Sequence, residues 1–214
     1  MVMQAHEIFD LLVATFGDAV FGFTEGGSVK DPFARVRPES LPEVAKTLRD
    51  HPALRFDFLE NVTAVDYPDV PPVLPPTPEP PAEEGVSQPG PSDAGKTAAP
   101  QGSVEVVYHF FSYEHKHDFI LKVSLPRENP RVPSLTSLWQ SANWLEREQY
   151  DLLGVVFEGH PDLRRLLLPE DWVGHPLRKD YVPPSSYRGM STERPNPLDM
   201  LPLGDEAAGP GGTP

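Results

Sequence analysis

Three histidines and a glutamate in the stretch "HFFSYEHKH" are the first residues whose types could do chemistry. His109, His115, His117 and Glu114 carry nitrogen and oxygen ligands of the kind that zinc binds. The apolar pattern around His109 predicts a strand, whereas His115 and His117 fall in the loop that follows it. Because these side chains then point in different directions, we favour packing and an exposed loop over a metal site.

The acidic residues of "WLEREQYDLL" form a second candidate set. Glu146, Glu148 and Asp151 could act as general acids or bases. Their spacing indicates a helix surface instead, since Arg147 lies four residues before Asp151 and the two are expected to pair along it. Glu148 and Asp151 are like charges three residues apart, and they would gain from an external cation such as an arginine.

Two further histidines each precede a proline. His160 and His175 lie in Gly-His-Pro triplets, where the proline holds the histidine backbone extended. Histidine titrates near neutral pH, so either could be a general acid or base in a cleft. The sequence has neither a Gly-x-Ser-x-Gly nor a His-Glu-x-x-His motif. We therefore favour histidines that cap turns or bond across an interface.

All three tryptophans lie in the same stretch, interleaved with basic residues. Such mixtures are concentrated at the centres of protein–protein interfaces. Burial in the core would explain the tryptophans equally well. The residues are Trp139, Trp144, Trp172, Arg164, Arg165, Arg178 and Lys179.

The composition excludes several classes of function. A chain of 214 residues fits one domain of ordinary size, and its net charge of −14 repels nucleic acid and anionic lipid. The absence of cysteine excludes disulfides and thiolate ligands for zinc or iron–sulfur clusters. No apolar run approaches the ~20 residues that cross a bilayer, and the N-terminus lacks a basic leader. We expect a soluble chain without a transmembrane segment.

Hydrophobic patterning predicts the elements that must position these residues. Ser40 and Glu43 have the spacing of a capping box, and Gly154 ends the helix that carries the acidic set. The fold class we expect is α+β, a small antiparallel sheet with helices packed on one side, followed by a helical and extended C-terminal segment. The expected helices are 5–16, one that begins at Ser40, and 135–153; the expected strands are 19–23, 33–36, one within 56–67, 104–113 and 118–126.

A Pro-rich segment interrupts this pattern. From Pro68 to Pro100, eleven of 33 residues are proline and Lys96 is the one basic residue. Such a segment buries too little apolar surface to offset its ordering entropy, so we expect an acidic, disordered insertion. The expected divisions are a first part of the α+β domain at 1–67, the insertion at 68–102, a second part at 103–181, and an extended or disordered tail at 182–214.

Beyond these physical arguments, "EREQYDLLGVVFEGHPDLRRLL" resembles the motif of the C subunit of the proton-translocating NADH:quinone oxidoreductase, respiratory complex I. That motif is Glu-Arg-Glu, two residues, an acid, two apolar residues, six more, His, three more, then a basic residue and an apolar pair. The following "LLPEDWVGHPLRKDY" is similar to the family's continuation. The matching residues are Glu146, Arg147, Glu148, Asp151, Leu152, Leu153, His160, Arg164, Leu166 and Leu167.

The resemblance implies a non-catalytic subunit of the peripheral arm that binds no cofactor or metal itself. Flavin mononucleotide and iron–sulfur clusters would belong to partner subunits. The implied partners are the quinone-site (D-like) and the small cluster-bearing (B-like) proteins of the complex, on the cytoplasmic side of the bacterial cell membrane. The implied interface or motif residues are Glu146, Arg147, Glu148, Asp151, His160, Arg164, His175, Arg178, Lys179 and Asp180.

Two alternatives remain beside this interpretation. The chain could be the equivalent subunit of a membrane-bound hydrogenase or a ferredoxin-dependent complex. More remotely, it could be a stand-alone enzyme that uses His160 or His175. The insertion at 68–102 and the "DYV" at 180–182, where the family has Asp-Tyr-Pro, depart from the family pattern.

Overall fold

The computed structural model of the chain describes residues 2–26, 31–68 and 102–192. Contacts divide the chain into two compact units, Met1–Tyr181 and Val182–Pro214. The expected Pro-rich insertion at 68–102 falls almost wholly outside the described residues. Among the helices that are described, none is long and apolar enough to cross a membrane.

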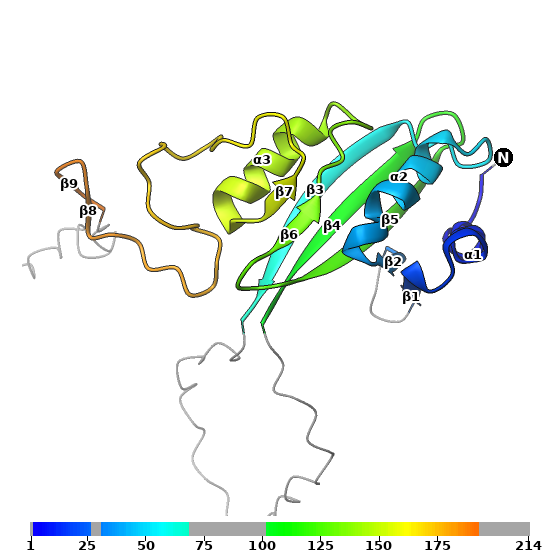
Figure 1. Cartoon of the computed structure of the whole chain (residues 1–214), viewed down its shortest axis with the longest axis horizontal. Coiled ribbons are helices and arrows are strands. Elements are labelled where there is room, and N and C mark those ends of the chain that lie inside the picture. Colours follow the sequence, from blue (N-terminus) through cyan, green and yellow to red (C-terminus); the bar gives the residue numbers. More distant parts are fainter. Residues whose placement is uncertain (1, 27–30, 69–101, 193–214) are drawn as a thin grey trace, which may run out of the picture. The chain divides into compact units, whose positions relative to one another are not determined.

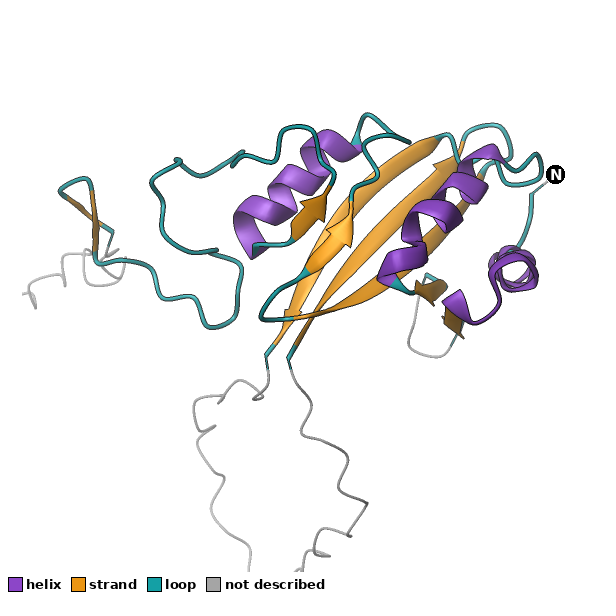
Figure 2. Ribbon diagram, in the orientation of Figure 1, coloured by secondary structure: helices purple, strands orange, loops and turns teal. Residues whose placement is uncertain are grey.

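A five-stranded sheet in the order β1-β2-β5-β4-β3 forms the frame of the first unit (Figures 1 and 2). Its three long strands, of ten residues each, form a meander in which the middle strand, β4, pairs antiparallel with both β3 and β5. The strands are β1 (Val20–Thr24), β2 (Phe33–Val36), β3 (Phe58–Tyr67), β4 (Ser103–Ser112) and β5 (His117–Pro126).

The sheet is mixed, so the expectation of an antiparallel sheet is only partly right. β2 and β5 pair in parallel, with Ala34 opposite Leu121. The cause is the helix between β2 and β3, because a helical crossover returns the next strand in the same direction. Two reversals in the meander then bring β5 back beside β2 and parallel to it. The patterning predicted the strands but not this crossover.

The irregular apolar pattern of β3 has a simple structural cause. The register against β4 shifts between Leu59 and Asn61, as in a β-bulge. One extra residue moves the following side chains to the opposite face. Leu59 and Val62 are consequently both fully buried although they lie three positions apart.

The first two helices are close to their predicted positions. α1 (Ala5–Phe16) begins with the Gln4 N–H donating to the Glu7 carboxylate at 2.8 Å. α2 (Leu41–Asp50) follows directly from a short 3-10 turn, η2 (Pro38–Ser40), and a second such turn, η1 (Gly17–Ala19), follows α1. The predicted capping box at Ser40 is wrong, because Ser40 is itself helical in η2 and its side chain caps nothing.

Helix α3 (Ala142–Leu153) carries the acidic motif and is shorter than predicted. Residues 135–141 form turns, in which the N–H groups of Leu138 and Trp139 donate to the Leu135 carbonyl. Gly154 ends α3 in the left-handed region at φ 77°, as its position predicted.

Helices α2 and α3 lie over one face of the sheet, and α1 lies beside β1 and β2 (Figure 2). Apolar side chains of the helices and the sheet form a single core. From α1, Ile8 and Leu12 are fully buried, and from α3, Ala142 is. Alternate residues of the two central strands supply the rest of this face. They are Val104, Val106, Tyr108 and Phe110 on β4 and Phe119, Leu121, Val123 and Leu125 on β5.

Two small pairs of strands complete the described structure. β6 (Arg131–Pro133) and β7 (Val156–Glu158) are parallel and lie on either side of α3 in the sequence. In the second unit, β8 (Ser186–Tyr187) and β9 (Met190–Ser191) form a short antiparallel hairpin.

Candidate functional site

The motif residues meet where α3 packs against residues 159–181, a segment without helix or strand that we call the motif loop. Asp151 on α3 is fully buried and organises this contact. One of its carboxylate oxygens accepts the N–H groups of Leu166, Leu167 and Leu168 at 3.0, 2.7 and 2.8 Å. The other accepts from the Arg165 guanidinium at 2.8 Å. Three successive backbone donors on one oxygen fix the path of the loop.

The protonation of Asp151 follows from these bonds. Desolvation by burial raises the pKa of this carboxyl, but the three backbone donors and Arg165 outweigh it and hold the pKa below its usual value. Asp151 is therefore ionised at neutral pH. The predicted pairing of Asp151 with Arg147 along the helix is wrong, because Asp151 faces the motif loop and Arg165 occupies its side.

Glu146 is equally buried but lies in a very different environment. Its carboxyl group accepts the Ser134 hydroxyl at 2.6 Å and the Leu135 N–H at 2.7 Å, and within the described structure no cation contacts it. Desolvation dominates and raises the pKa of Glu146 to about 7. The Tyr108 hydroxyl on β4 is buried with no hydrogen-bond partner among the described residues. Burial, and then the nearby Glu146, raise the pKa of Tyr108 well above its usual value.

Arg147 reaches the motif loop from the next position of α3. Its Nε donates to the Arg164 carbonyl at 3.1 Å and its Nη2 to the Arg165 carbonyl at 3.3 Å. The guanidinium lies over the Trp144 ring, 5.0 Å from its centroid. Arg147 is only 5% exposed, and within the described structure it pairs with no carboxylate.

The last carbonyl groups of α3 receive donors from the other end of the motif loop. His175 Nδ1 lies 2.9 Å from the Asp151 carbonyl, the Leu177 N–H donates to Leu152, and Arg178 Nε donates to Leu153. Helix C-termini leave such carbonyls unsatisfied and favour nearby cations. Burial lowers the pKa of His175, which suits its role as a neutral donor to a carbonyl.

A second anchor ties the end of the motif loop to the sheet. Arg127, just beyond β5, binds the Asp66 carboxylate at 2.6 and 2.9 Å and the Asp180 carboxylate at 2.7 and 3.2 Å. Asp66 also accepts the Lys179 N–H at 2.9 Å. The hydrogen bond from Arg127 chiefly lowers the pKa values of Asp66 and Asp180. Sequence reasoning missed Asp66 and Arg127. The available signal was an acidic residue at a position of β3 whose side chain is buried.

The remaining motif residues lie closer to solvent. His160 is half-buried, with Nε2 3.2 Å from the Asn143 carbonyl and Nδ1 accepting the Asp162 N–H. Arg164 is exposed and pairs with Asp162 at 3.0 Å. Glu148 is half-buried on α3. The predicted motif residues therefore separate into a buried set that bonds within the chain and an outer set.

The histidine cluster does not form a metal site among the described residues, although the rings of His115 and His117 lie 5.5 Å apart, and one of its predicted positions is wrong. His117 is not a loop residue, since it begins β5 and is 4% exposed. Its ring nitrogens bond the Leu54 carbonyl at 2.7 Å and the Met3 N–H at 3.4 Å. His115 bonds the Pro52 carbonyl at 2.9 Å. The residues that the structure describes hold no group of three His, Cys, Asp or Glu that could bind a metal.

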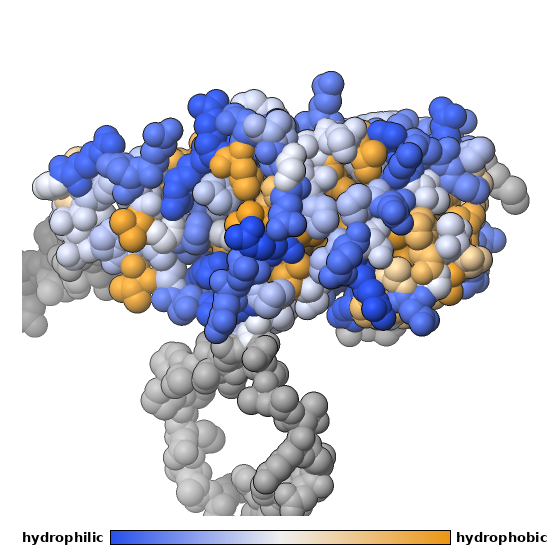
Figure 3. All heavy atoms as spheres, in the orientation of Figure 1, coloured by the Kyte–Doolittle hydropathy of each residue, from blue (hydrophilic) through white to orange (hydrophobic). Residues whose placement is uncertain are grey.

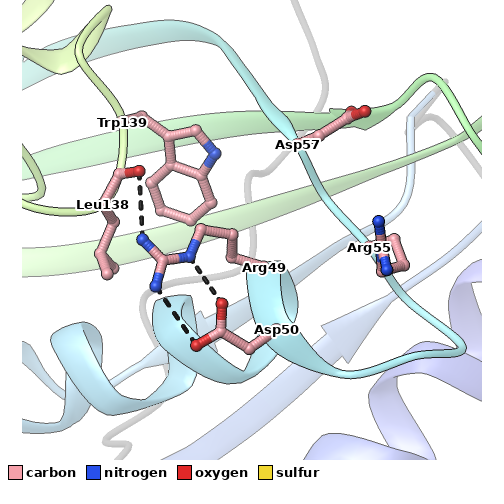
Figure 4. A pocket seen from close by; sticks show the side chains of 6 residues that line it. All are labelled: Arg49, Asp50, Arg55, Asp57, Leu138 and Trp139. Carbon is pink, nitrogen blue, oxygen red and sulfur yellow. Dashed lines mark hydrogen bonds and ion pairs between the residues drawn. The ribbon is translucent and has the colours of Figure 1, made fainter.

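Two clefts flank this part of the molecule. The first, of about 390 Å³, is lined by Arg49, Asp50, Arg55, Asp57, Leu138 and Trp139 (Figure 4). The charge of Arg49 is neutralised there by Asp50, which it contacts at 2.7 and 3.2 Å. The second cleft, of about 650 Å³, lies between α3 and the motif loop. It is lined by Thr136, Ser137, Gln140, Asn143, Trp144, Arg147, Gly159, Pro161, Asp162 and Arg164.

Apolar side chains of α3 and the motif loop are left exposed around this framework. Trp144 and Leu167 are each 60% exposed, and Val173 is 81% exposed. Figure 3 shows that apolar side chains reach the surface as separate patches between charged ones. The buried charges thus hold a loop with exposed apolar residues, an arrangement suited to binding a partner.

Comparison with known proteins relates this arrangement to a family. The sequence profile described as "Respiratory-chain NADH dehydrogenase, 30 Kd subunit" matches residues 34–187. The chain is 41% identical over 180 residues to the C subunit of NADH-quinone oxidoreductase from Roseiflexus castenholzii, covering 84% of this chain and 85% of the relative. It is 36% identical over 191 residues to the protein of that name in Chlorobium phaeobacteroides, covering 88% and 95%.

Solved structures agree on the fold. A trypsin-resistant fragment of Nqo5 superposes with a TM-score of 0.50 at 29% identity, covering 75% of this chain and all of the fragment. A chain of an archaeal membrane-bound sulfane sulfur reductase superposes with a TM-score of 0.53 over 84% of this chain and 86% of its own. At 18% identity, the second likeness concerns the fold alone.

Proposed function

Because this chain belongs to the family of the 30 kDa subunit of respiratory-chain NADH dehydrogenase, we propose that it is the C subunit of an NADH–quinone oxidoreductase. Within that enzyme it acts as a docking subunit of the peripheral arm. The complex transfers electrons from NADH to quinone and couples this reaction to proton translocation. The chain contributes shape and contacts to the complex, and the redox chemistry takes place elsewhere.

The match over residues 34–187 carries this proposal, because it spans most of the sheet, α3 and the whole motif loop. The use of the motif residues supports a docking role. Asp151 and His175, which could serve as acid or base, are instead bonded to backbone groups of the motif loop and α3. Groups held in this way position a surface and are not free to accept a proton from a substrate.

The cofactors and partners follow from the same assignment. Flavin mononucleotide and the iron–sulfur clusters belong to other proteins of the complex. The neighbours of this chain are the quinone-site, D-like protein and the smaller cluster-bearing, B-like protein. The chain sits on the cytoplasmic side of the bacterial cell membrane and associates with it through these partners.

Purification of the tagged chain from detergent-solubilised membranes tests the proposal. We expect flavin and iron–sulfur subunits to co-purify, together with NADH-driven quinone reduction. The purified chain alone should oxidise no NADH. Co-purification of nickel–iron subunits would assign the chain to a hydrogenase instead. Recovery of the chain alone from the cytosol would overturn the docking role.

A further inference from the structure

The cleft between α3 and the motif loop contains a buried positive charge without a carboxylate partner. Arg147 lines this cleft and is, among the described residues, the one arginine that is less than a tenth exposed. Its Nε and Nη2 are bound to backbone carbonyls, and its Nη1 makes no hydrogen bond within the described structure. Nη1 is not among the buried side-chain atoms that lack a partner, so it is accessible from the cleft and offers a charged donor to an anion there.

Two other arginines with mostly buried side chains have a carboxylate counter-ion within the chain. Arg127 pairs with Asp66, and Arg165 pairs with Asp151. In the cleft of Figure 4, Arg49 pairs with the adjacent Asp50. Arg178 is half-buried and, within the described structure, also lacks a carboxylate partner, but it donates to the Leu153 carbonyl at the end of α3. Arg147 is the more deeply buried of the two and lines the cleft.

The mouth of the same cleft adds a second cation and an aromatic surface. Arg164 has a side chain that is 66% exposed, and Trp144 presents a ring that is 60% exposed. Asp162 is the one acid in the described lining. A cleft with two arginines and one acid stands out on a chain of net charge −14. Tryptophan and arginine are also the side chains that dominate binding energy at protein interfaces.

We propose that this cleft receives an acidic side chain of another protein of the complex, followed in that protein by an apolar residue. The carboxylate binds Arg147 Nη1 and Arg164 in the forked geometry that guanidinium groups offer. The apolar residue covers the exposed face of Trp144. The inference rests on the proposed function, since it names the chemistry by which the docking subunit recognises its partner.

Charge reversal at the mouth of the cleft tests the proposal without disturbing the fold. Arg164 contacts only Asp162 through its side chain within the described structure, so Arg164→Glu leaves the loop anchors intact. We expect the tagged variant to recover about tenfold less of the partner subunits than the wild type at low salt, and the difference should shrink at high salt, where the charges are screened. Arg131→Glu is the matched control, because Arg131 is also exposed and also has an acid neighbour, Glu158, but does not line the cleft.

The outcomes separate this inference from the proposed function. If the wild type recovers the oxidoreductase and Arg164→Glu recovers it equally well, the cleft inference is wrong and the docking role stands. If the wild type recovers no partner, the proposed function itself fails. Equal thermal unfolding of the two variants checks that neither has lost its fold.

A photo-crosslinker identifies the occupant directly. Benzoyl-phenylalanine replaces Gln140, which lines the cleft and is exposed, and is irradiated in membranes that contain the assembled complex. We expect a crosslink to another protein of the complex within a few residues of an Asp or Glu. A crosslink to residues 69–101 or 193–214 of this chain, or to a basic segment of a partner, would overturn the proposal.

Discussion

The sheet and the motif loop are held in place by opposite kinds of interaction. In the sheet, alternate residues of β4 and β5 and the apolar stripes of the helices form one core. In the motif loop, buried carboxylates and guanidinium groups bind backbone atoms of a segment without regular structure. In a sheet, the strands satisfy each other's backbone groups, and alternation of apolar and polar residues is enough to form the core. An irregular loop needs a specific hydrogen-bond partner for each backbone group that it buries. The density of charge in the motif reflects this need.

Loss of Asp151 is expected to have the largest effect, because it should destabilise the motif loop and leave the sheet intact. In Asp151→Asn an NH2 group replaces one of the two oxygens, so either Arg165 or the three Leu166–Leu168 N–H groups face a donor, and Arg165 loses its negative partner in both cases. The free energy for opening the motif loop should fall by about 3–5 kcal/mol, because a buried charge loses its partner. Hydrogen exchange at neutral pH measures this opening.

Leu121→Ala is the matched control in the sheet, where it is expected to cost about 2–5 kcal/mol by leaving a cavity. Its effect should appear first in the exchange of β4 and β5 amides. In Asp151→Asn those amides should keep their protection. If both variants lowered protection uniformly, the sheet and the motif loop would not be separate in their stability.

A pH-dependent effect of the next size is expected at Glu146. Its folded-state pKa of about 7 lies above its unfolded value, so the folded state binds more protons between the two. The stabilisation is complete below the unfolded pKa and is lost as pH rises through about 7. From pH 4 to 8, the free energy of unfolding of the wild type should fall relative to Glu146→Gln by roughly 3 kcal/mol.

Urea unfolding of both proteins across this pH range provides the measurement. Glutamine keeps the shape of the protonated acid but does not titrate. If the difference in unfolding free energy between the two proteins did not change with pH, Glu146 would have an ordinary pKa. Its carboxyl group would then be in contact with water in solution.

Gly154 ends α3 and lies against His175 of the motif loop. An added Cβ would lie 2.7 Å from the His175 ring, and the backbone φ of 77° disfavours other residues. Gly154→Ala should lower the stability of the motif loop by about 2 kcal/mol, from backbone strain together with the displaced ring. Gly159→Ala is the control, because its φ is 82° but its Cβ would meet nothing within 4 Å. Equal thermal unfolding of the two variants would contradict a packed His175.

The smallest expected effect concerns His117, at the start of β5. Desolvation lowers its folded-state pKa below its ordinary value, and its neutral ring serves both the Leu54 carbonyl and the Met3 N–H. The unfolded state therefore binds more protons below about pH 6.5, and stability falls as pH decreases through this range. His117→Gln should show a weaker decline between pH 7 and 5. A decline of the same size in thermal unfolding would assign it to other groups.

Local patterns predicted the elements well. The periodicity of α1 and the C-cap at Gly154 depend on residues a few positions apart, and both are confirmed. The parallel pairing of β2 with β5 depends on the crossover through α2, which alternation within a strand does not encode.

The site was predicted less completely than the elements, for a related reason. The motif identified Asp151 and Arg147, but the expected pair between them considered neighbours on one helix only. The actual partners lie 14 to 18 residues away along the chain. Asp66 and Arg127, which are 61 residues apart, meet only because β3 and β5 lie in one sheet. Contacts of this kind follow from topology and not from spacing.

The most direct test of the account measures amide hydrogen exchange at Leu166, Leu167 and Leu168 in the isolated, full-length chain. If Asp151 holds the motif loop without help from a partner, these three amides exchange slowly in the wild type and quickly in Asp151→Asn. Fast exchange of all three in the isolated wild-type chain would contradict the account. It would mean that the motif charges become organised only when the partner proteins are present.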